Sequence, residues 1–232
     1  MIRIGTSGFQ YPEWKGKFYP EKLSAAKMLP FYAEKFSTTE SNYTFRRMPT
    51  EKTLANWSAQ TPENFRFALK APQQITHFQK LVGSAETLEY FWKIAQTLGE
   101  KLGPILFQLP PFLKKDLARL EDFLAVIPKG MKAAFEFRDE SWFDDEIFAA
   151  LKFHNAALCI ADSEKFSTPV VGTSDFGYFR LRDQYSKPEL KKWAKIIAQE
   201  SKRVEEIFVY FKHEETGSGP EFAKQLQKLL DV

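Results

Sequence analysis

Residues 132–138 read Lys132-Ala-Ala-Phe-Glu-Phe-Arg138, a short apolar run that ends by alternating rings with charges. Successive residues of a strand point to opposite faces. We therefore expect Phe135 and Phe137 to pack against neighbouring helices while Glu136 and Arg138 point inward. The functional face of a barrel lies at the carboxyl ends of its strands. Charged side chains at the end of an apolar strand are therefore typical of such a face.

Seven further runs have the same form, and most of the stretches between them carry helical periodicity. The other predicted strands are Ile2–Gly8, Thr38–Tyr43, Phe65–Ala71, Pro104–Leu109, Ala157–Asp162, Tyr178–Asp183 and Ile207–His213. The predicted helices are Ser24–Phe36, Thr50–Ala59, Ser84–Lys101, Lys114–Val126, Ser141–Phe153, Pro188–Arg203 and Pro220–Leu230. This alternation predicts an α/β fold, a (β/α)8 TIM barrel whose functional face lies at the carboxyl ends of its strands.

The chain of 232 residues is of the usual size for one such barrel, so we expect a single domain over residues 1–232. The segment between strands six and seven, Ser163–Gly177, is irregular, because Pro169 and Gly172 leave room for one short turn.

The composition predicts a cytoplasmic protein without a membrane segment. Apolar stretches such as Ile147–Leu151 are too short to span a bilayer, and no signal peptide precedes the first strand. Cys159 is the one cysteine, and we expect it to be a small buried residue of a reduced protein. The net charge of +3 permits an anionic ligand but is below that of dedicated nucleic-acid binders.

Strand parity places further polar side chains on the inner face. It groups Glu40 with Asn42 and Arg180 with Arg182, while other polar residues lie near the ends of strands three, four, six and eight. We predict one shared cavity at the carboxyl end of the barrel, lined by Glu40, Lys70, Gln108, Glu136, Arg138 and Asp162. The alternative is a set of structural ion pairs that closes the barrel top.

The predicted catalytic residues are Glu40, Glu136, Arg138 and Asp162. An arginine beside a carboxylate lowers the pKa of that carboxylate, so Arg138 would hold Glu136 ionised as a base, a nucleophile or a substrate anchor. Two carboxylates that face one cavity also permit general acid–base or glycosidase-type chemistry, provided that their pKa values are pushed apart.

The predicted substrate-binding residues carry positive charge, hydrogen-bonding groups or rings. They are Ser7, Tyr11, Asn42, Lys70, His77, Gln108, Trp142, Arg180, Arg182 and Lys212. Aromatic residues of the first loop, such as Trp14 and Phe18, either form a hydrophobic collar or stack on a sugar or base.

An anion site is predicted near strands seven and eight. Arg180, Arg182, Lys212 and His213 would supply the charge, and Gly217–Pro220 would open the last helix with accessible N–H groups. The counter-interpretation is that Asp183, Glu214 and Glu215 already neutralise these cations.

No cofactor is predicted. The three histidines, His77, His154 and His213, have no spacing that places two ligands on one face, and neither a Gly-x-Gly-x-x-Gly motif nor a Walker sequence is present. A divalent metal held by Glu40, Glu136, Asp162 and either His77 or His213 stays an alternative.

Several motifs resemble those of a known family. They are Gly5-Thr-Ser-Gly8 with Tyr11, Trp14, Gly16 and Phe18-Tyr-Pro20, then Glu40-Ser-Asn42 with Thr44-Phe45, Trp57 with Thr61-Pro62, Phe65–Lys70, Ile75-Thr-His77, Gln108-Leu-Pro110, and Glu136-Phe-Arg138 with Ser141-Trp142. Together they resemble the YecE-like family of uncharacterised TIM-barrel proteins, also known as domain of unknown function seventy-two. The resemblance implies the barrel and supplies no reaction. The last third of the chain departs from the family pattern at two places. This chain reads Arg180-Leu-Arg182-Asp183 after the seventh strand and Phe211-Lys212-His213 after the eighth.

These features together predict an enzyme that acts on a small anionic substrate, such as a phosphorylated or carboxylated sugar or nucleotide, at the carboxyl mouth of the barrel. One alternative is a nucleic-acid-binding or DNA-repair-associated barrel resembling abasic-site endonucleases, and another is a non-catalytic binding protein. Binding to a nucleic-acid backbone would weaken steeply with salt, whereas a small-molecule site would be enclosed. The reaction type and the oligomeric state stay open.

Overall fold

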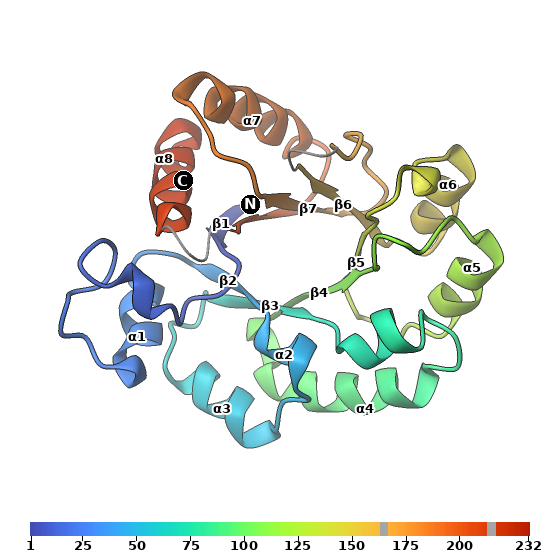
Figure 1. Ribbon diagram of the computed structural model, residues 1–232, viewed down its shortest axis with the longest axis horizontal. Helices are drawn as coiled ribbons and strands as arrows, with labels where there is room; N and C mark the ends of the chain where they lie inside the picture. The colour runs from blue at the N-terminus through green and yellow to red at the C-terminus, as the bar shows by residue number, and fades with distance from the viewer. Residues whose placement is uncertain (163–166, 213–216) are drawn as a thin grey trace.

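Eight parallel strands form the centre of the computed structural model, which describes residues 1–162, 167–212 and 217–232. The strands are β1 (Ile2–Thr6), β2 (Thr38–Ser41), β3 (Arg66–Lys70), β4 (Leu102–Gln108), β5 (Ala133–Glu136), β6 (Ala157–Ala161), β7 (Phe176–Leu181) and β8 (Glu206–Phe211). They are paired in the order β1-β8-β7-β6-β5-β4-β3-β2 and enclose the barrel seen in Figure 1. The TIM-barrel prediction is confirmed, and each predicted strand overlaps an observed one.

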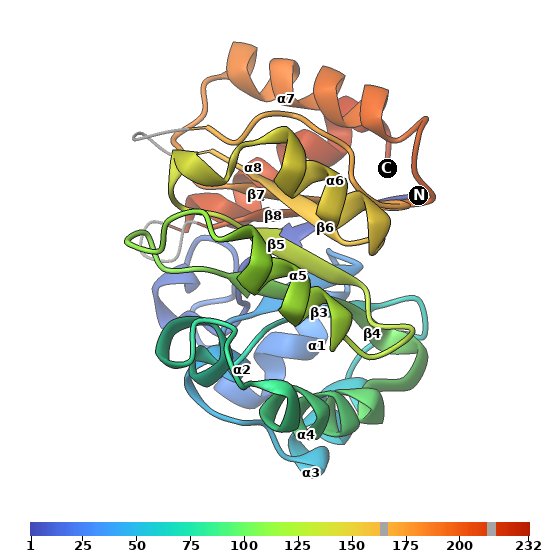
Figure 2. The same cartoon turned by 90° about the vertical axis from the view of Figure 1, so that its right-hand side faces the viewer.

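Helices surround this ring on the outside (Figures 1 and 2). They are α1 (Met28–Ala33), α2 (Tyr43–Arg46), α3 (Glu51–Ala59), α4 (Ala85–Ala95), α5 (Leu117–Ala125), α6 (Asp145–Phe153), α7 (Lys187–Glu200) and α8 (Ser218–Leu230). Local signals fix their ends: Asp116 accepts a hydrogen bond from the backbone N–H of Arg119, and Ser186 with Glu189 forms a capping box at α7.

The predicted helix Ser84–Lys101 is shorter than expected. It ends at Ala95 and continues as a 3₁₀ segment, Gln96–Lys101, in which Gly99 has a φ of 54°. A residue with positive φ cannot continue a right-handed helix, and glycine adopts this conformation most readily. Between β6 and β7, the described residues 167–175 contain no helix, in agreement with the expected irregularity.

The barrel closes between β1 and β2 through few backbone contacts. Ser7 and Glu40 form an isolated parallel bridge, and the N–H of Gly8 donates to the carbonyl of Glu40 at 2.7 Å. The hydroxyl of Tyr32, from α1, accepts from the N–H of Thr6 at 2.8 Å. A side chain on Gly5 would place its Cβ 2.1 Å from the carbonyl oxygen of Thr38, so this close approach requires glycine.

Two apolar layers follow from strand parity. Outside the barrel, Phe135 stacks on Phe107 with ring centres 5.2 Å apart, and Phe137 stacks on Trp142 at 4.6 Å. Inside the barrel, small residues of β3, β5 and β6 face rings from β7 and β8; this interior set is Ala68, Leu106, Ala134, Ala157, Cys159, Ala161, Phe176, Tyr178, Phe208 and Tyr210. Cys159 is buried as expected. The interior is therefore a packed core with ion pairs at both ends: Arg180 pairs with Glu40 and Glu136 at the carboxyl end, and Arg3 pairs with Glu206 at the amino end.

Within the described residues, no helix is both long enough and apolar enough to cross a membrane.

Candidate functional site

A buried ion triad lies at the carboxyl end of the barrel. Arg180 of β7 donates through Nη2 to Glu40 Oε1 of β2 at 2.8 Å and through Nη1 to Glu136 Oε2 of β5. All three side chains are within 1% of complete burial. Charges this deeply buried persist because they pair with one another, and Arg180 is the shared partner of both carboxylates.

Further hydrogen bonds reach both oxygens of Glu40. The hydroxyl of Tyr178 donates to Oε2 at 2.7 Å, and the hydroxyl of Ser7 donates to Oε1. Asn42 Nδ2 in turn donates to Ser7 Oγ at 3.2 Å. Glu40 is thus fixed as an ionised acceptor at the position where the barrel closes.

Lys70 and Gln108 extend the network from Glu136 toward the barrel mouth. Gln108 Nε2 donates to Glu136 Oε1 at 2.8 Å, and Lys70 Nζ donates to Gln108 Oε1 at 2.8 Å. A carboxylate accepts and cannot donate, so the amide nitrogen of Gln108 must face Glu136 and its oxygen must face Lys70. The carboxylate therefore meets the amine of Lys70 through a neutral amide.

The pKa shifts show which of these groups stay charged. Burial alone would raise the pKa of Glu136, but Arg180, Arg182 and the hydrogen bonds of Gln108 and Arg180 lower it to about 2. Burial also opposes ionisation of Glu40, yet Arg180, Ser7 and Tyr178 hold its pKa below the usual range. Both carboxylates are therefore ionised at neutral pH.

The pKa of Lys70 is lowered too, but for an amine this shift favours the neutral form. Burial and the nearby charge of Arg180 lower its pKa to about 7, although Glu136 and Glu40 oppose the shift. The amine also lies 3.9 Å from the ring centre of Phe45. Lys70 is therefore the group of this network that changes its charge near neutral pH.

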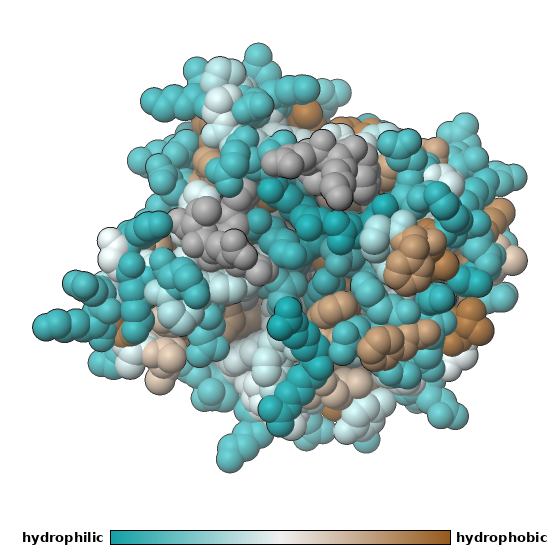
Figure 3. Space-filling view, in the orientation of Figure 1, coloured by the Kyte–Doolittle hydropathy of each residue, from teal (hydrophilic) through white to brown (hydrophobic). Residues whose placement is uncertain are grey.

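A cavity of about 410 Å³ lies next to Lys70, at the mouth. It is lined by Tyr11, Asn42, Tyr43, Phe45, Arg46, Lys70 and Lys212. Four of the predicted substrate-binding residues, Tyr11, Asn42, Lys70 and Lys212, therefore share one cavity. In the view down the barrel, hydrophilic side chains gather at the centre of the face and hydrophobic ones form patches on its right-hand side (Figure 3).

Other predicted residues lie under or beside this cavity. Ser7, Glu40, Gln108 and Glu136 belong to the buried network below it. Arg182 Nη1 is 3.4 Å and Arg138 Nε is 4.0 Å from Glu136 Oε1, so Arg180, and not Arg138, is the principal partner of Glu136.

His77 lies beside this network, on the π-helical turn Gln74–Phe78. Its Nδ1 is 2.9 Å from Thr76 Oγ1, and its ring packs edge-on against Phe45. Burial together with Lys70 and Arg138 lowers the pKa of His77.

Two predicted residues lie outside the site. Asp162 accepts from the hydroxyl of Tyr185 at 2.6 Å and from the N–H of Arg182 at 2.8 Å, so its predicted place in the shared cavity is wrong. Ala161 faces the barrel interior, and the next residue of the strand therefore faces outward. Trp142 is buried against Phe137 and donates to the carbonyl of Leu113 at 2.8 Å, so this ring does not reach the mouth.

The residues predicted to form one anion site near strands seven and eight lie in separate parts of the structure. Arg180 is engaged in the buried triad, and Lys212 lines the mouth cavity. Gly217, Ser218 and Pro220 line a separate cavity of about 380 Å³ with Lys17, Phe18, Glu221 and Lys224. His213, Glu214 and Glu215, which entered both interpretations, lie outside the described residues.

Four side chains of the mouth and its network were absent from the predicted site: Tyr43, Phe45, Arg46 and Tyr178. Phe45 and Arg46 belong to α2, a short helix that begins where the second strand was expected to end. Thr44 Oγ1 donates to the carbonyl of Lys70 at 2.6 Å and so fastens α2 beside the end of β3. Tyr178 shares the parity of Arg180, and this signal could have identified it.

The aromatic residues of the first loop form mainly a hydrophobic collar. Trp14, Phe18 and Tyr19 are buried and pack on one another, which agrees with the hydrophobic collar that was one of the two interpretations of Trp14 and Phe18. Tyr11 is the member of this loop that lines the mouth cavity, and its hydroxyl donates to the carbonyl of Ser7 at 2.9 Å.

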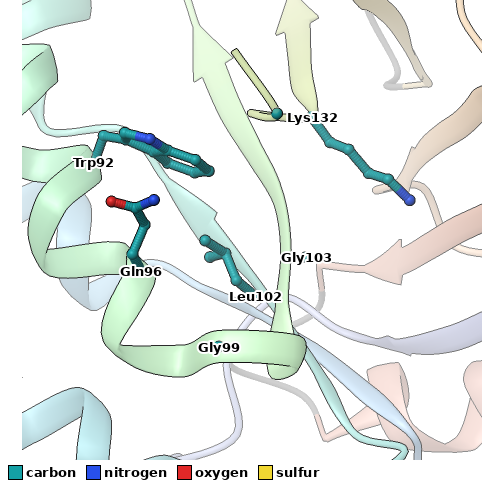
Figure 4. A pocket seen from close by; sticks show the side chains of 7 residues that line it. Trp92, Gln96, Gly99, Leu102, Gly103 and Lys132 are labelled. Carbon is teal, nitrogen blue, oxygen red and sulfur yellow. The ribbon is translucent and has the colours of Figure 1, made fainter. Parts of the chain in front are cut away.

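A further cavity, of about 280 Å³, lies at the opposite end of the barrel, where β4 begins. Trp92, Gln96 and Leu102 point toward one another there, whereas Lys132 points away (Figure 4). Lys132 Nζ is 3.2 Å from Glu206 Oε2. Catalytic groups of TIM barrels come from the carboxyl ends of strands, so this cavity is not the candidate site.

The charges of Glu40, Glu136 and Lys70 decide which reactions the mouth cavity could support. Glycosidase-type catalysis needs one carboxyl group kept protonated, but the pKa values of Glu40 and Glu136 are both lowered. Lys70 is the group best suited to exchange a proton or to act as a nucleophile at neutral pH. Among the described residues, no cluster of three or more His, Cys, Asp or Glu side chains could hold a metal ion.

Comparisons with known proteins agree with this architecture. The family described as "Protein of unknown function DUF72" matches residues 3–232. "UPF0759 protein YunF" of Bacillus subtilis is 25% identical across 100% of this chain and 95% of its own length. "UPF0759 protein YecE" of Escherichia coli is 28% identical over 62% of this chain and 50% of its own length.

Solved structures are also similar to this chain. A DUF72 family protein from Thermotoga maritima has a TM-score of 0.91 and 29% identity, with 100% of both chains covered. One from Enterococcus faecalis has a TM-score of 0.85 at 22% identity, covering 100% of this chain and 96% of its own, and supports the fold alone.

Proposed function

This chain belongs to the DUF72 family of proteins of unknown function, and we propose that it is an enzyme that binds a small anionic substrate in the mouth cavity. A phosphorylated or carboxylated sugar or nucleotide is the substrate class that the cavity suits best. The observation that carries this proposal is the charge of the lining: it includes Arg46, Lys70 and Lys212 and, among the described residues, no carboxylate.

The electrostatics of the mouth support this choice. A concave site lined by one sign of charge concentrates ligands of the opposite sign. Glu40 and Glu136, the nearest carboxylates of the network, already have cationic partners in the layer below: Arg180 pairs with both, and Arg182 Nη1 lies 3.4 Å from Glu136 Oε1. A phosphate or carboxylate in the cavity would thus meet the positive charge of the lining, while the two buried carboxylates remain engaged with Arg180 and Arg182.

The size of the cavity supports a small molecule over a nucleic acid. Its volume of about 410 Å³ lies within the usual range of small-molecule sites. Polar groups of Tyr11 and Asn42 and the exposed ring of Tyr43 line the same space. Such a lining suits the hydroxyl groups and faces of a sugar.

Thermal unfolding in the presence of a matched ligand pair tests the proposal. Glucose 6-phosphate should raise the Tm of the protein in a saturable way, whereas glucose should leave it unchanged, because the phosphate supplies the binding energy. Lys212→Met and Arg46→Met should each reduce the shift. Lys224→Met, in the separate basic cavity, is the control variant and should retain it.

A Tm that does not respond to phosphorylated compounds would refute the proposal. A shift that disappears in Lys224→Met but persists in Lys212→Met would place the anion site in the other cavity. Tight binding to an oligonucleotide that weakens steeply with salt would favour the nucleic-acid alternative.

A further inference from the structure

We propose that Lys70 is a catalytic nucleophile that forms an imine with a carbonyl group of the substrate. The substrate class then narrows to aldehydes and ketones that carry a phosphate or carboxylate group. This inference rests on the proposed function, because the anionic group is what would bring the carbonyl into the mouth cavity.

The position of Lys70 supports this role. The residue ends β3, and catalytic groups of a TIM barrel come from the carboxyl ends of its strands. Its side chain is largely buried but still lines the mouth cavity together with Arg46 and Lys212. A bound anion held by those two cations would therefore lie in the same cavity as the amine.

The contacts of the amine leave it chemically competent. Nζ donates to the neutral oxygen of Gln108 at 2.8 Å and lies over the ring of Phe45 at 3.9 Å. Within the described residues, Lys70 forms no salt bridge with a carboxylate, because Arg180 engages Glu40 and Glu136. A lysine that is desolvated beside another cation is one of the general ways in which proteins activate an amine.

The charged surroundings of Lys70 come from several strands and favour the neutral amine. Burial and Arg180 of β7 lower its pKa to about 7, Lys212 after β8 acts in the same direction, and Glu136 of β5 and Glu40 of β2 oppose it. Arg46 lines the same cavity, and His77 lies on the turn after β3. A far larger fraction of Lys70 than of an ordinary lysine would therefore be unprotonated, and so nucleophilic, at neutral pH.

The proposed step balances without a co-reactant. The lone pair of the neutral amine attacks the carbonyl carbon, a C–N bond forms, and the carbonyl oxygen leaves as water with the two amine protons. Uptake of one proton from solvent gives the iminium ion. Its positive charge would lie where the ammonium now lies, over the face of Phe45, and such a ring stabilises a cation.

Reductive trapping tests the inference. The whole protein is treated at pH 7 with sodium cyanoborohydride and limiting glyceraldehyde or glyceraldehyde 3-phosphate, and the modified lysines are mapped by peptide mass spectrometry. Glyceraldehyde should label Lys70 at least tenfold faster than the exposed Lys93, and the phosphorylated probe should label it faster still. An ordinary lysine has a pKa of about 10.4 and is almost fully protonated at this pH.

The pH profile and the variants complete the test. Labelling of Lys70 should rise with a midpoint near pH 7. Lys93→Arg, a surface control, should leave labelling of Lys70 unchanged. Phe45→Leu should slow it while Lys93 is labelled at its former rate.

The outcomes separate this inference from the proposed function. Labelling of Lys70 by both probes at equal rates would support the imine and count against the anion site. Glucose 6-phosphate that raises the Tm while Lys70 is labelled no faster than Lys93 would retain the anion site and overturn the imine.

Discussion

The guanidinium of Arg180 contacts two carboxylates that come from different strands, Glu40 of β2 and Glu136 of β5. The resulting triad joins strands that are far apart in the pairing order of the barrel. The loss of Arg180 would leave two buried carboxylates without their shared partner, and the loss of either carboxylate would leave the buried guanidinium with one partner in place of two. The free-energy cost of such a loss is much larger than the net contribution of the intact pair.

Glu136→Gln tests whether this residue serves stability. The variant keeps the shape of the side chain but removes one of the two carboxylate charges that face Arg180, so we expect the free energy of unfolding to fall by about 3 kcal/mol, the lower end of the range for a broken buried pair. Urea denaturation at pH 7 measures the loss. Glu140→Gln, an exposed neighbour, should change little. A Glu136→Gln variant as stable as the wild type would refute the structural role and point to one in chemistry.

The pH dependence of stability tests the environment of Lys70. Its pKa is about 7 in the folded protein and about 10.4 in an unfolded chain, so the unfolded chain binds more protons between these values. The free energy of unfolding should therefore rise from pH 7 to pH 9, by at most about 1.4 kcal/mol per pH unit. Above that range, buried tyrosines such as Tyr178, whose pKa is raised, act in the opposite direction.

Lys70→Met is the matched variant for this measurement. Removing the amine should flatten the profile between pH 7 and pH 9, whereas Lys93→Met should follow the wild type. Parallel profiles for the wild type and Lys70→Met would show that Lys70 keeps an ordinary pKa.

At the scale of elements, β1 and β2 depend on Gly5 for their close approach. Gly5→Ala would place a Cβ 2.1 Å from the carbonyl oxygen of Thr38 and 2.9 Å from the hydroxyl of Tyr32. Both neighbours belong to the closure, so we expect a loss of about 3 kcal/mol in the free energy of unfolding. Urea denaturation provides the value.

Gly172→Ala is the control for this substitution, because its Cβ would have an ordinary contact of 3.5 Å with Glu200. The control should unfold at the same urea concentration as the wild type, to within experimental error. Equal midpoints for Gly5→Ala and the wild type would show that closure tolerates a methyl group.

The elements also show what the sequence could and could not predict. Strand positions were readable because each apolar run ends in polar residues, and the inward direction of Glu136 followed from parity. The same rule would have placed Asp162 outside, since Ala157, Cys159 and Ala161 face inward on β6. The error came from treating every polar strand end as part of the mouth.

Pairing at the mouth could not be predicted, because it depends on distances between strands that parity does not supply. The sequence suggests Arg138 as the partner of Glu136 since the two are neighbours on one strand, but Arg180 of β7 lies closer. The role of α2 was missed for a similar reason: residues 43–46 are too few to show helical periodicity, and tertiary contacts of Thr44 hold them.

At the scale of the whole molecule, the barrel separates charge into two layers. The lower layer contains the triad of Arg180, Glu40 and Glu136, and Arg182 adds a second cation 3.4 Å from Glu136. The upper layer is the mouth cavity with Arg46, Lys70 and Lys212. A barrel that merely closed its top with ion pairs would not need this second, positive layer, and its charge is the basis of the proposed function.

Anomalous diffraction from crystals soaked in tungstate, a tetrahedral oxyanion, tests this claim most directly. The account predicts a tungsten peak in the mouth cavity, within contact distance of Arg46 and Lys212, that glucose 6-phosphate displaces. A peak confined to the cavity between Lys17 and Lys224, or a map without any peak at the mouth, would contradict it.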